Sequence, residues 1–147
     1  MTFSAVAATA RVADMISSSD AGCMMHGPTF MANPLACAVA LAPTRLLLSS
    51  PWQQRIARIE SLMKENLSPA RALPDVRDLR VLGGIGVVEV DKPVDCGEFQ
   101  KRCVKEGVWI RPFGHNCYIM PPYMAVTDEQ VIRLSEALVR LVAELPR

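Results

Sequence analysis

The chain has 147 residues, of which 50% are hydrophobic and 21% are charged. This composition is typical of a globular protein and argues against an extended disordered chain. The formal net charge is +1, and basic residues alternate with acidic ones, as in Lys64-Glu65 and Lys105-Glu106. We therefore expect neither a nucleic-acid-binding protein nor a protein bound to a membrane surface.

The five cysteines are odd in number and form no C-x-x-C pair, which argues against a secreted disulfide framework. Reduced thiols in a cytoplasmic protein are the expectation. Arg11 and Asp14 follow the apolar N-terminus too closely for a signal peptide. The longest apolar stretch, Pro34 to Ala42, is too short to span a bilayer.

The first fifty residues predict two helices and a loop. The alanine-rich segment from Phe3 to Ser18 predicts a short helix, and Cys23 to Met31 predicts a loop. Asn33 is expected to cap a second helix, with Pro34 in its first turn and its end at about Leu48. These elements would leave most of their packing partners missing, which indicates a piece of a larger domain.

The next segment predicts a helix and a strand pair. Ser50 is expected to cap a helix that has Pro51 in its first position and ends at about Asn66. Val76 to Leu82 and Ile85 to Val90 are rich in β-branched residues and are separated only by two glycines. They predict a two-stranded antiparallel unit.

The C-terminal third continues the alternation of helices and strands. Asp95 is expected to cap a helix that Gly107 ends, and short strands are expected at Val108 to Arg111 and Tyr118 to Met120. Thr127 and Gln130 predict a capping box on a last amphipathic helix. Residues 51–147 therefore predict a compact α/β lobe with a small, partly antiparallel sheet, distinct from residues 1–50.

One segment, from Met25 to Ala38, combines a Gly-Pro turn, a threonine hydroxyl and a capped helix start. Backbone N–H groups, a hydroxyl and a helix N-terminus together suit a phosphate. The alternative is an ordinary helix-entry loop in which Thr29 bonds locally. A zinc site built from Cys23, His26, His115 and Cys117 is a further alternative, but the spacings differ from those of zinc fingers, and we expect no metal.

Four segments together resemble the class III (fold type I) pyridoxal-phosphate aminotransferases. His26 to Ala38 resembles the motif H-x-x-T-F-x-x-N-P-L-A-C-A, and Asp78 to Glu89 resembles the D-V-R-V-x-G-A-I-G-V-x-E strand pair. Gly107 to Gly114 and Tyr118 to Tyr123 resemble the G-V-W-[IL]-R-P-F and Y-x-M-P-P-Y segments. The Gly-Pro before the threonine is similar to the branch of the family that acts in biotin synthesis.

The resemblance implies a fold and a reaction. Residues 1–50 would be a remnant of the large pyridoxal-5′-phosphate-binding domain, and residues 51–147 would be the small C-terminal α/β domain. The intact family member would be a cytoplasmic homodimer. It would transfer an amino group from S-adenosylmethionine to 8-amino-7-oxononanoate.

The resemblance also assigns site residues. Thr29, with Gly27 and Pro28, would bind the cofactor phosphate of the neighbouring subunit, and His26 would line the substrate. Arg111 would bind the substrate carboxylate. From its residue type alone, Arg111 suits a bidentate carboxylate contact or, alternatively, a surface ion pair.

The catalytic lysine of the family has no match in the chain. Its four lysines, Lys64, Lys92, Lys101 and Lys105, fall on predicted helix faces or in a turn. The resemblance implies that the Schiff-base lysine lies just upstream of Met1. The chain would then be a C-terminal fragment that is inactive alone. The alternative is a non-catalytic module that pairs with a full-length aminotransferase subunit.

Overall fold

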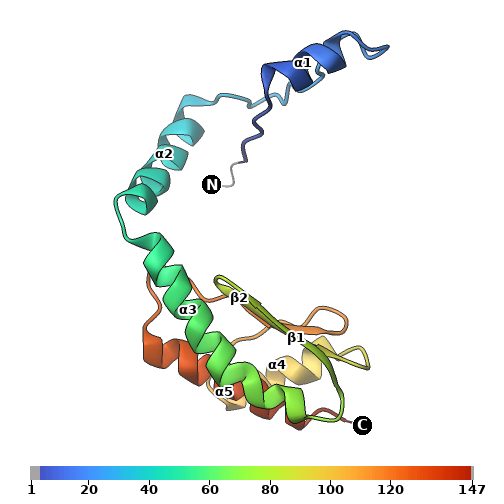
Figure 1. Cartoon of the computed structure of the whole chain (residues 1–147), viewed down its shortest axis with the longest axis vertical. Helices are drawn as coiled ribbons and strands as arrows, with labels where there is room; N and C mark the ends of the chain where they lie inside the picture. Colours follow the sequence, from blue (N-terminus) through green and yellow to red (C-terminus); the bar gives the residue numbers. More distant parts are fainter. Residues whose placement is uncertain (1–3, 147) are drawn as a thin grey trace. The chain divides into compact units, whose positions relative to one another are not determined.

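The computed structural model describes residues 4–146, and the chain divides after Ser50 into two compact units (Figure 1). The first unit contains the helices α1 (Ala10–Ser17) and α2 (Pro34–Leu48). The second contains α3 (Trp52–Leu67), the 3₁₀ helix η1 (Ser68–Ala72), β1 (Val76–Leu82), β2 (Ile85–Val90), α4 (Cys96–Lys105), β3 (Asn116–Ile119) and α5 (Asp128–Ala143).

Helix α1 is shorter than the sequence predicts. Thr9 adopts an extended backbone and its hydroxyl accepts a hydrogen bond from the N–H of Val12 at 3.4 Å, so the helix begins at Ala10. The predicted start at Phe3 lies outside the described residues, but residues 4–9 are not helical, and the prediction was wrong there. No residue of α1 is buried, so no tertiary packing stabilises further helical residues before its cap.

Helix α2 follows the prediction at both ends. Asn33 Oδ1 accepts the N–H of Ala36 at 3.1 Å, Pro34 occupies the first position, and the helix ends at Leu48. It continues through Pro43, which has no N–H to donate. No residue of α2 is buried, and among the described residues no single helix is long and apolar enough to span a membrane.

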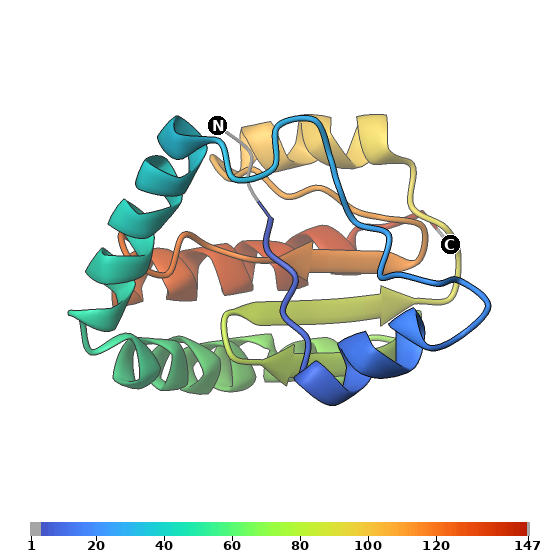
Figure 2. The ribbon, with the colours of Figure 1, turned by 90° about the horizontal axis from the view of Figure 1, so that it is seen from above.

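The second unit is built on a three-stranded antiparallel sheet with the order β1-β2-β3 (Figure 2). Its strands β1 and β2 have the predicted bounds and pairing, and Gly83, at a φ of +55°, forms the turn between them. Helices α3 and α5 pack against each other and against the sheet, and α4 packs against α5. The small antiparallel sheet confirms the predicted α/β lobe.

Alternating strand residues point to the helices. Leu79, Val88 and Cys117 are cross-strand neighbours, and all three are buried. Gly86 faces α3 so closely that an added Cβ would lie 2.7 Å from Leu67 Cδ1. The remaining core comes mainly from the helices, with these largest buried side chains: Phe99, Met63, Leu67, Leu138 and Leu141.

The caps predicted for α4 and α5 are confirmed. Asp95 Oδ1 accepts the N–H of Glu98 at 2.8 Å, and Gly107 follows α4 with a φ of +71°. Thr127 and Gln130 bond each other's backbone N–H groups, which completes the capping box of α5. These contacts are local in sequence, and a residue pattern can therefore predict them.

The cap predicted for α3 is wrong. Helix α3 begins at Trp52 with Pro51 at the cap position, and no side-chain hydrogen bond caps it. The hydroxyl of Ser50 instead donates to the carbonyl oxygen of Leu47 at 2.8 Å, at the end of α2. A serine between two helices can serve either one.

One of the two short strands predicted before α5 is absent. Val108 to Arg111 forms no strand, because Pro112 lacks an N–H and the N–H of Val108 donates to Cys103 O of α4 at 3.0 Å. Phe113 and Asn116 exchange two backbone hydrogen bonds of 2.8 and 2.9 Å. This tight turn starts β3 at Asn116, two residues before the predicted start.

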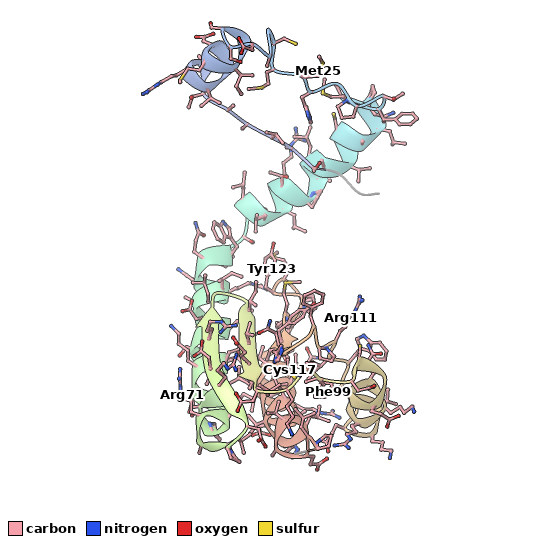
Figure 3. All side chains as sticks on the ribbon, turned by 90° about the vertical axis from the view of Figure 1, so that its right-hand side faces the viewer. Met25, Arg71, Phe99, Arg111, Cys117 and Tyr123 are labelled. Carbon is pink, nitrogen blue, oxygen red and sulfur yellow. The ribbon has the colours of Figure 1, made fainter. Side chains whose placement is uncertain are left out.

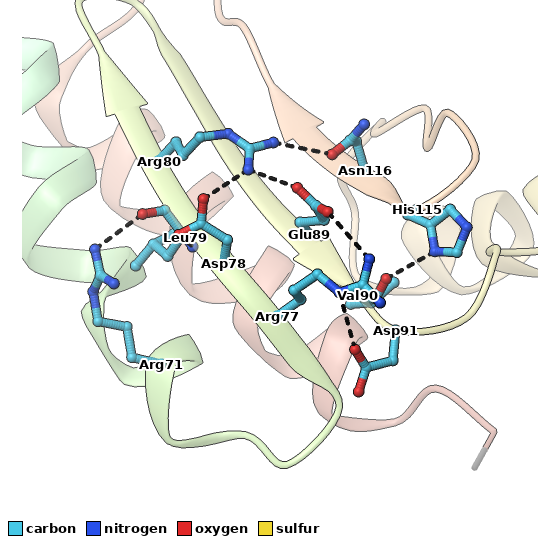
Figure 4. A network of polar contacts seen from close by, with 10 residues as sticks. All are labelled: Arg71, Arg77, Asp78, Leu79, Arg80, Glu89, Val90, Asp91, His115 and Asn116. Atoms are coloured by element: carbon cyan, nitrogen blue, oxygen red, sulfur yellow. Dashed lines mark hydrogen bonds and ion pairs between the residues drawn. The ribbon is translucent and has the colours of Figure 1, made fainter.

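A polar network covers part of the sheet face opposite the helices (Figure 4). Arg80 Nη1 donates to Asp78 Oδ2 at 2.7 Å and to Glu89 Oε2 at 2.6 Å, and Nη2 donates to Asn116 Oδ1 at 3.2 Å. The hydrogen bond from Arg80, followed by that from the N–H of Leu79, lowers the pKa of Asp78. One arginine thereby links all three strands.

The packing of α5 can be tested with two identical substitutions. Leu138→Ala should lower the free energy of unfolding by about 2–5 kcal/mol, because Leu138 is fully buried. Leu82→Ala should change it by less than about 0.5 kcal/mol, because that side chain is 81% exposed. Urea denaturation followed by circular dichroism measures both, and equal losses would contradict the described core.

The lowered pKa of Asp78 predicts a pH-dependent contribution to stability. A carboxyl group whose pKa is lowered by folding stabilises the fold above its unfolded pKa of about 3.9, and this contribution disappears as the pH falls through the folded pKa. Asp78→Asn should therefore destabilise the chain at pH 7 and have little effect near pH 2. In an Arg80→Gln background the pH dependence of the same change should shrink, and an unchanged dependence would contradict the assigned cause.

Candidate functional site

The loop before α2 is formed by two consecutive turns. The N–H of Met31 donates to Pro28 O at 2.9 Å, and the N–H of Asn33 donates to Phe30 O at 3.2 Å. Asn33 then caps the helix. The turns place Thr29 four residues before the cap, in a loop that runs directly into a helix N-terminus.

Ala32 closes this loop in an unfavourable conformation. Its φ is +57°, and among the described residues it is the one non-glycine residue with a positive φ. The left-handed region costs a residue with a Cβ about 1–2 kcal/mol, because Cβ crowds the following carbonyl oxygen. The loop geometry is therefore held against local strain.

Thr29 and its neighbours are exposed. Thr29, Pro28, Gly27 and His26 all lie on the surface of the first unit, and the Thr29 hydroxyl makes no hydrogen bond to any described residue. An uncommitted hydroxyl beside a helix N-terminus provides donors and positive potential, which suit a phosphate group. By the chemistry of these donors, the loop fits the phosphate end of a cofactor.

Arg111 lies in the second unit, at the end of the segment that follows α4, and points outward (Figure 3). Its guanidinium group forms no ion pair or hydrogen bond with any described residue. The surface ion pair, which was the alternative drawn from the sequence, is not formed among these residues. A guanidinium group without a partner can bind an external carboxylate through two parallel hydrogen bonds.

A groove of about 670 Å³ opens beside Arg111. It is lined by Gly107, Val108, Trp109, Ile110, Arg111, Tyr118, Ile119, Met120, Pro121, Pro122, Ala125, Val126, Gln130, Arg133 and Leu134. The lining is mostly apolar, carries two arginines and contains no carboxylate. Arg133 was not found from the sequence, since only the packing of α5 brings it beside Gly107.

None of the four lysines lines this groove. Lys64 forms an ion pair with Glu60 on α3, and Lys101 forms one with Glu98 on α4. Lys92 follows β2 and Lys105 ends α4. All four belong to the second unit, while the Thr29 loop belongs to the first.

The cysteines and histidines form no metal centre among residues 4–146. Cys117 is buried in β3, and burial raises the pKa of its thiol to about 12, so it stays protonated at neutral pH. His115 Nδ1 lies 3.0 Å from the carbonyl oxygen of Val90. The thiol of Cys117 and the imidazole of His115 therefore each contact other parts of the fold.

Comparisons with known proteins match most of the length of this chain. Residues 1–142 match the family model "Aminotransferase class-III". The adenosylmethionine-8-amino-7-oxononanoate aminotransferase of Corynebacterium glutamicum is 47% identical over 139 residues, which cover 94% of this chain and 33% of that protein. The protein of the same name from Saccharomyces cerevisiae is 40% identical and covers 98% of this chain and 32% of that protein.

Solved structures give the same result. The enzyme of that name from Methanocaldococcus jannaschii superposes with a TM-score of 0.70 at 25% identity, over 82% of this chain and 30% of that chain. An ornithine aminotransferase from Toxoplasma gondii superposes with a TM-score of 0.70 at 26% identity, over 90% of this chain and 30% of that one. The chain thus spans about a third of the length of the relatives it matches.

The strain at Ala32 predicts opposite effects for one substitution at two positions. Ala32→Gly should stabilise the start of α2 by about 1 kcal/mol, because glycine adopts a positive φ without a steric penalty. Ala38→Gly, inside α2, should destabilise the helix by about 1 kcal/mol. Hydrogen exchange at the N–H of Cys37 measures both, and faster exchange in the Ala32→Gly variant would contradict the strained loop.

Proposed function

The chain belongs to the class III aminotransferase family, and we propose that it provides part of the active site of a pyridoxal-5′-phosphate-dependent aminotransferase of biotin synthesis. The proposed reaction transfers an amino group from S-adenosylmethionine to 8-amino-7-oxononanoate. Three relatives that carry the name of this reaction are 40–47% identical to the chain over 94–98% of its length, which supports the choice of substrates. We place the reaction in the cytoplasm, in keeping with the five free thiols.

The loop before α2 is the proposed phosphate contact. The Thr29 hydroxyl would donate to a phosphate oxygen. Gly27 and Pro28, which lead into the turn centred on Thr29 and Phe30, would keep the loop backbone close to the anion. The nearby N-terminus of α2 favours the negative charge of the phosphate. From the resemblance to class III aminotransferases, we propose that this loop reaches the cofactor of the other subunit in a homodimer. The exposure of residues 26–29 leaves them free for such a contact.

Arg111 is the proposed substrate anchor. Its guanidinium group, which has no partner within residues 4–146, would bind the carboxylate of each substrate through two parallel hydrogen bonds. Trp109 and Met120 line the same groove and would exclude water from the apolar part of the substrate. His26 would contact the substrate from the phosphate loop of the neighbouring subunit.

The cofactor, when bound, supplies an electron sink for the carbanion formed during amino transfer. Proton transfer and covalent attachment require a lysine amine. The chain's own lysines either form ion pairs, as Lys64 and Lys101 do, or lie outside the Arg111 groove. We therefore assign the Schiff-base lysine to none of them. The observation that carries the proposal is the family match across residues 1–142, which includes both Thr29 and Arg111.

A chimeric enzyme tests this proposal. The matching third of the Corynebacterium glutamicum relative would be replaced by this chain, and pyridoxal-phosphate retention and amino transfer from S-adenosylmethionine would be measured. We expect a folded dimer that retains the cofactor and forms 7,8-diaminononanoate. A folded, cofactor-bound dimer that transfers no amino group to 8-amino-7-oxononanoate would contradict the proposed substrates.

Two variants of the chimera separate the proposed roles. Thr29→Ala should raise the Kd for pyridoxal phosphate by about tenfold or more, because a hydrogen bond to a charged group contributes about 1.5–3 kcal/mol. Arg111→Gln should lower kcat/KM about a hundredfold for both substrates and leave cofactor retention unchanged. Thr44→Ala and Arg58→Gln are the matched controls, since Thr44 bonds its own helix and Arg58 pairs with Asp128. Equal losses in variants and controls would contradict the assigned roles.

A further inference from the structure

The arginines of the second unit fall into two groups. Seven of the nine described arginines form an ion pair with a carboxylate or donate a hydrogen bond to a backbone carbonyl. These seven are Arg55, Arg58, Arg71, Arg77, Arg80, Arg102 and Arg140. The other two, Arg111 and Arg133, have no such partner among the described residues, and both line the same groove.

The groove concentrates this positive charge on an apolar surface. Its volume of about 670 Å³ is within the range of small-molecule sites. Trp109, Met120 and Leu134 contribute apolar lining, and no lining residue is acidic. Two guanidinium groups without a neighbouring carboxylate favour a ligand with more than one negative charge.

Arg133 lies against Gly107, and both residues line the groove. Its Nη2 atom lies 2.7 Å from the position that a Cβ on Gly107 would take, so the guanidinium group covers the backbone of that glycine. A glycine at position 107 therefore allows the positive φ that ends α4, and its missing side chain leaves room for the guanidinium group of Arg133.

Arg111 lines the same groove four residues after Gly107. Trp109 is exposed, Ile110 is buried and Arg111 is exposed, which is the alternation of an extended segment. Four extended residues separate the Cα atoms of Gly107 and Arg111 by up to about 13 Å. The two guanidinium groups can therefore bind two different groups of one elongated ligand.

We propose that Arg133 is a second carboxylate-binding residue and that the groove takes an apolar chain with a carboxylate at each end. Arg111 binds one carboxylate, Arg133 binds the other, and Trp109 and Met120 contact the chain between them. The inference rests on the carboxylate role proposed for Arg111, but it requires no step of amino transfer.

Titration of the 147-residue chain with two eight-carbon acids tests this inference. Suberate has a carboxylate at each end and octanoate has one, so the difference in their affinities measures the contribution of the second carboxylate. Binding is followed by the indole N–H resonance of Trp109, assigned with a Trp52→Phe variant. We expect suberate to bind about tenfold more tightly than octanoate, as one additional charge-assisted hydrogen-bonded pair would give.

Variants then locate the second contact. Arg133→Gln should weaken suberate binding about tenfold and leave octanoate binding unchanged, and Arg133→Lys should weaken suberate binding by a smaller factor. Arg111→Gln should weaken both acids. Arg140→Gln, on the same helix as Arg133 and paired with Glu106, should change neither. Dispersed spectra with unshifted core resonances show that each variant is folded.

Two results would overturn the inference. Either suberate leaves the Trp109 resonance unshifted, or it binds a folded Arg133→Gln variant as tightly as the original chain. In the second case, loss of octanoate binding in Arg111→Gln still supports the carboxylate role of Arg111. Amino transfer by the chimera does not depend on how suberate binds to Arg133. A failure of the carboxylate role of Arg133 can therefore be distinguished from a failure of the proposed reaction.

Discussion

The packing of α3 and α5 against one face of the three-stranded sheet is the constraint on which the rest of the second unit depends. Met63 and Leu67 of α3 reach Gly86 in the middle strand, and Leu138 of α5 is fully buried. This core also buries Ile110. Because the side chain of Ile110 is buried in this core, the side chain of its neighbour Arg111 faces outward. Helix α5, which contributes Leu138 to the core, also places Arg133 beside the groove.

Residues 4–50 of the first unit form no comparable core. No residue of α1 or α2 is buried, and local contacts alone define the loop that carries Thr29: two turns, the Asn33 cap and a strained Ala32. Large apolar side chains, among them Phe30 and Leu35, stay exposed beside that loop. An exposed apolar surface of this extent is typical of an interface. The exposed apolar surface of the first unit is therefore what a piece of a larger domain would show, and the contact of the Thr29 loop with another subunit belongs to the proposed function.

Local patterns predicted most of the fold, and long-range contacts account for the errors. The Gly83-Gly84 hairpin and the Asn33 cap depend on residues a few positions apart, and both were predicted with the right bounds. Ser50 was assigned to the wrong helix because its hydroxyl can serve either neighbour. Arg133 reads as one more charged residue on an amphipathic helix. Only the tertiary packing beside Gly107 shows that it lines the groove and has no carboxylate partner among residues 4–146.

The central claim is that the Thr29 loop binds the cofactor phosphate of a neighbouring subunit. The most direct measurement is the distance from Thr29 Oγ1 to the nearest phosphate oxygen in a crystal structure of the cofactor-bound chimera. We expect a hydrogen bond of about 2.5–3.0 Å to the pyridoxal phosphate held by the other subunit. A Thr29 hydroxyl that contacts only its own subunit, or that faces solvent while the phosphate is bound elsewhere, would contradict this claim.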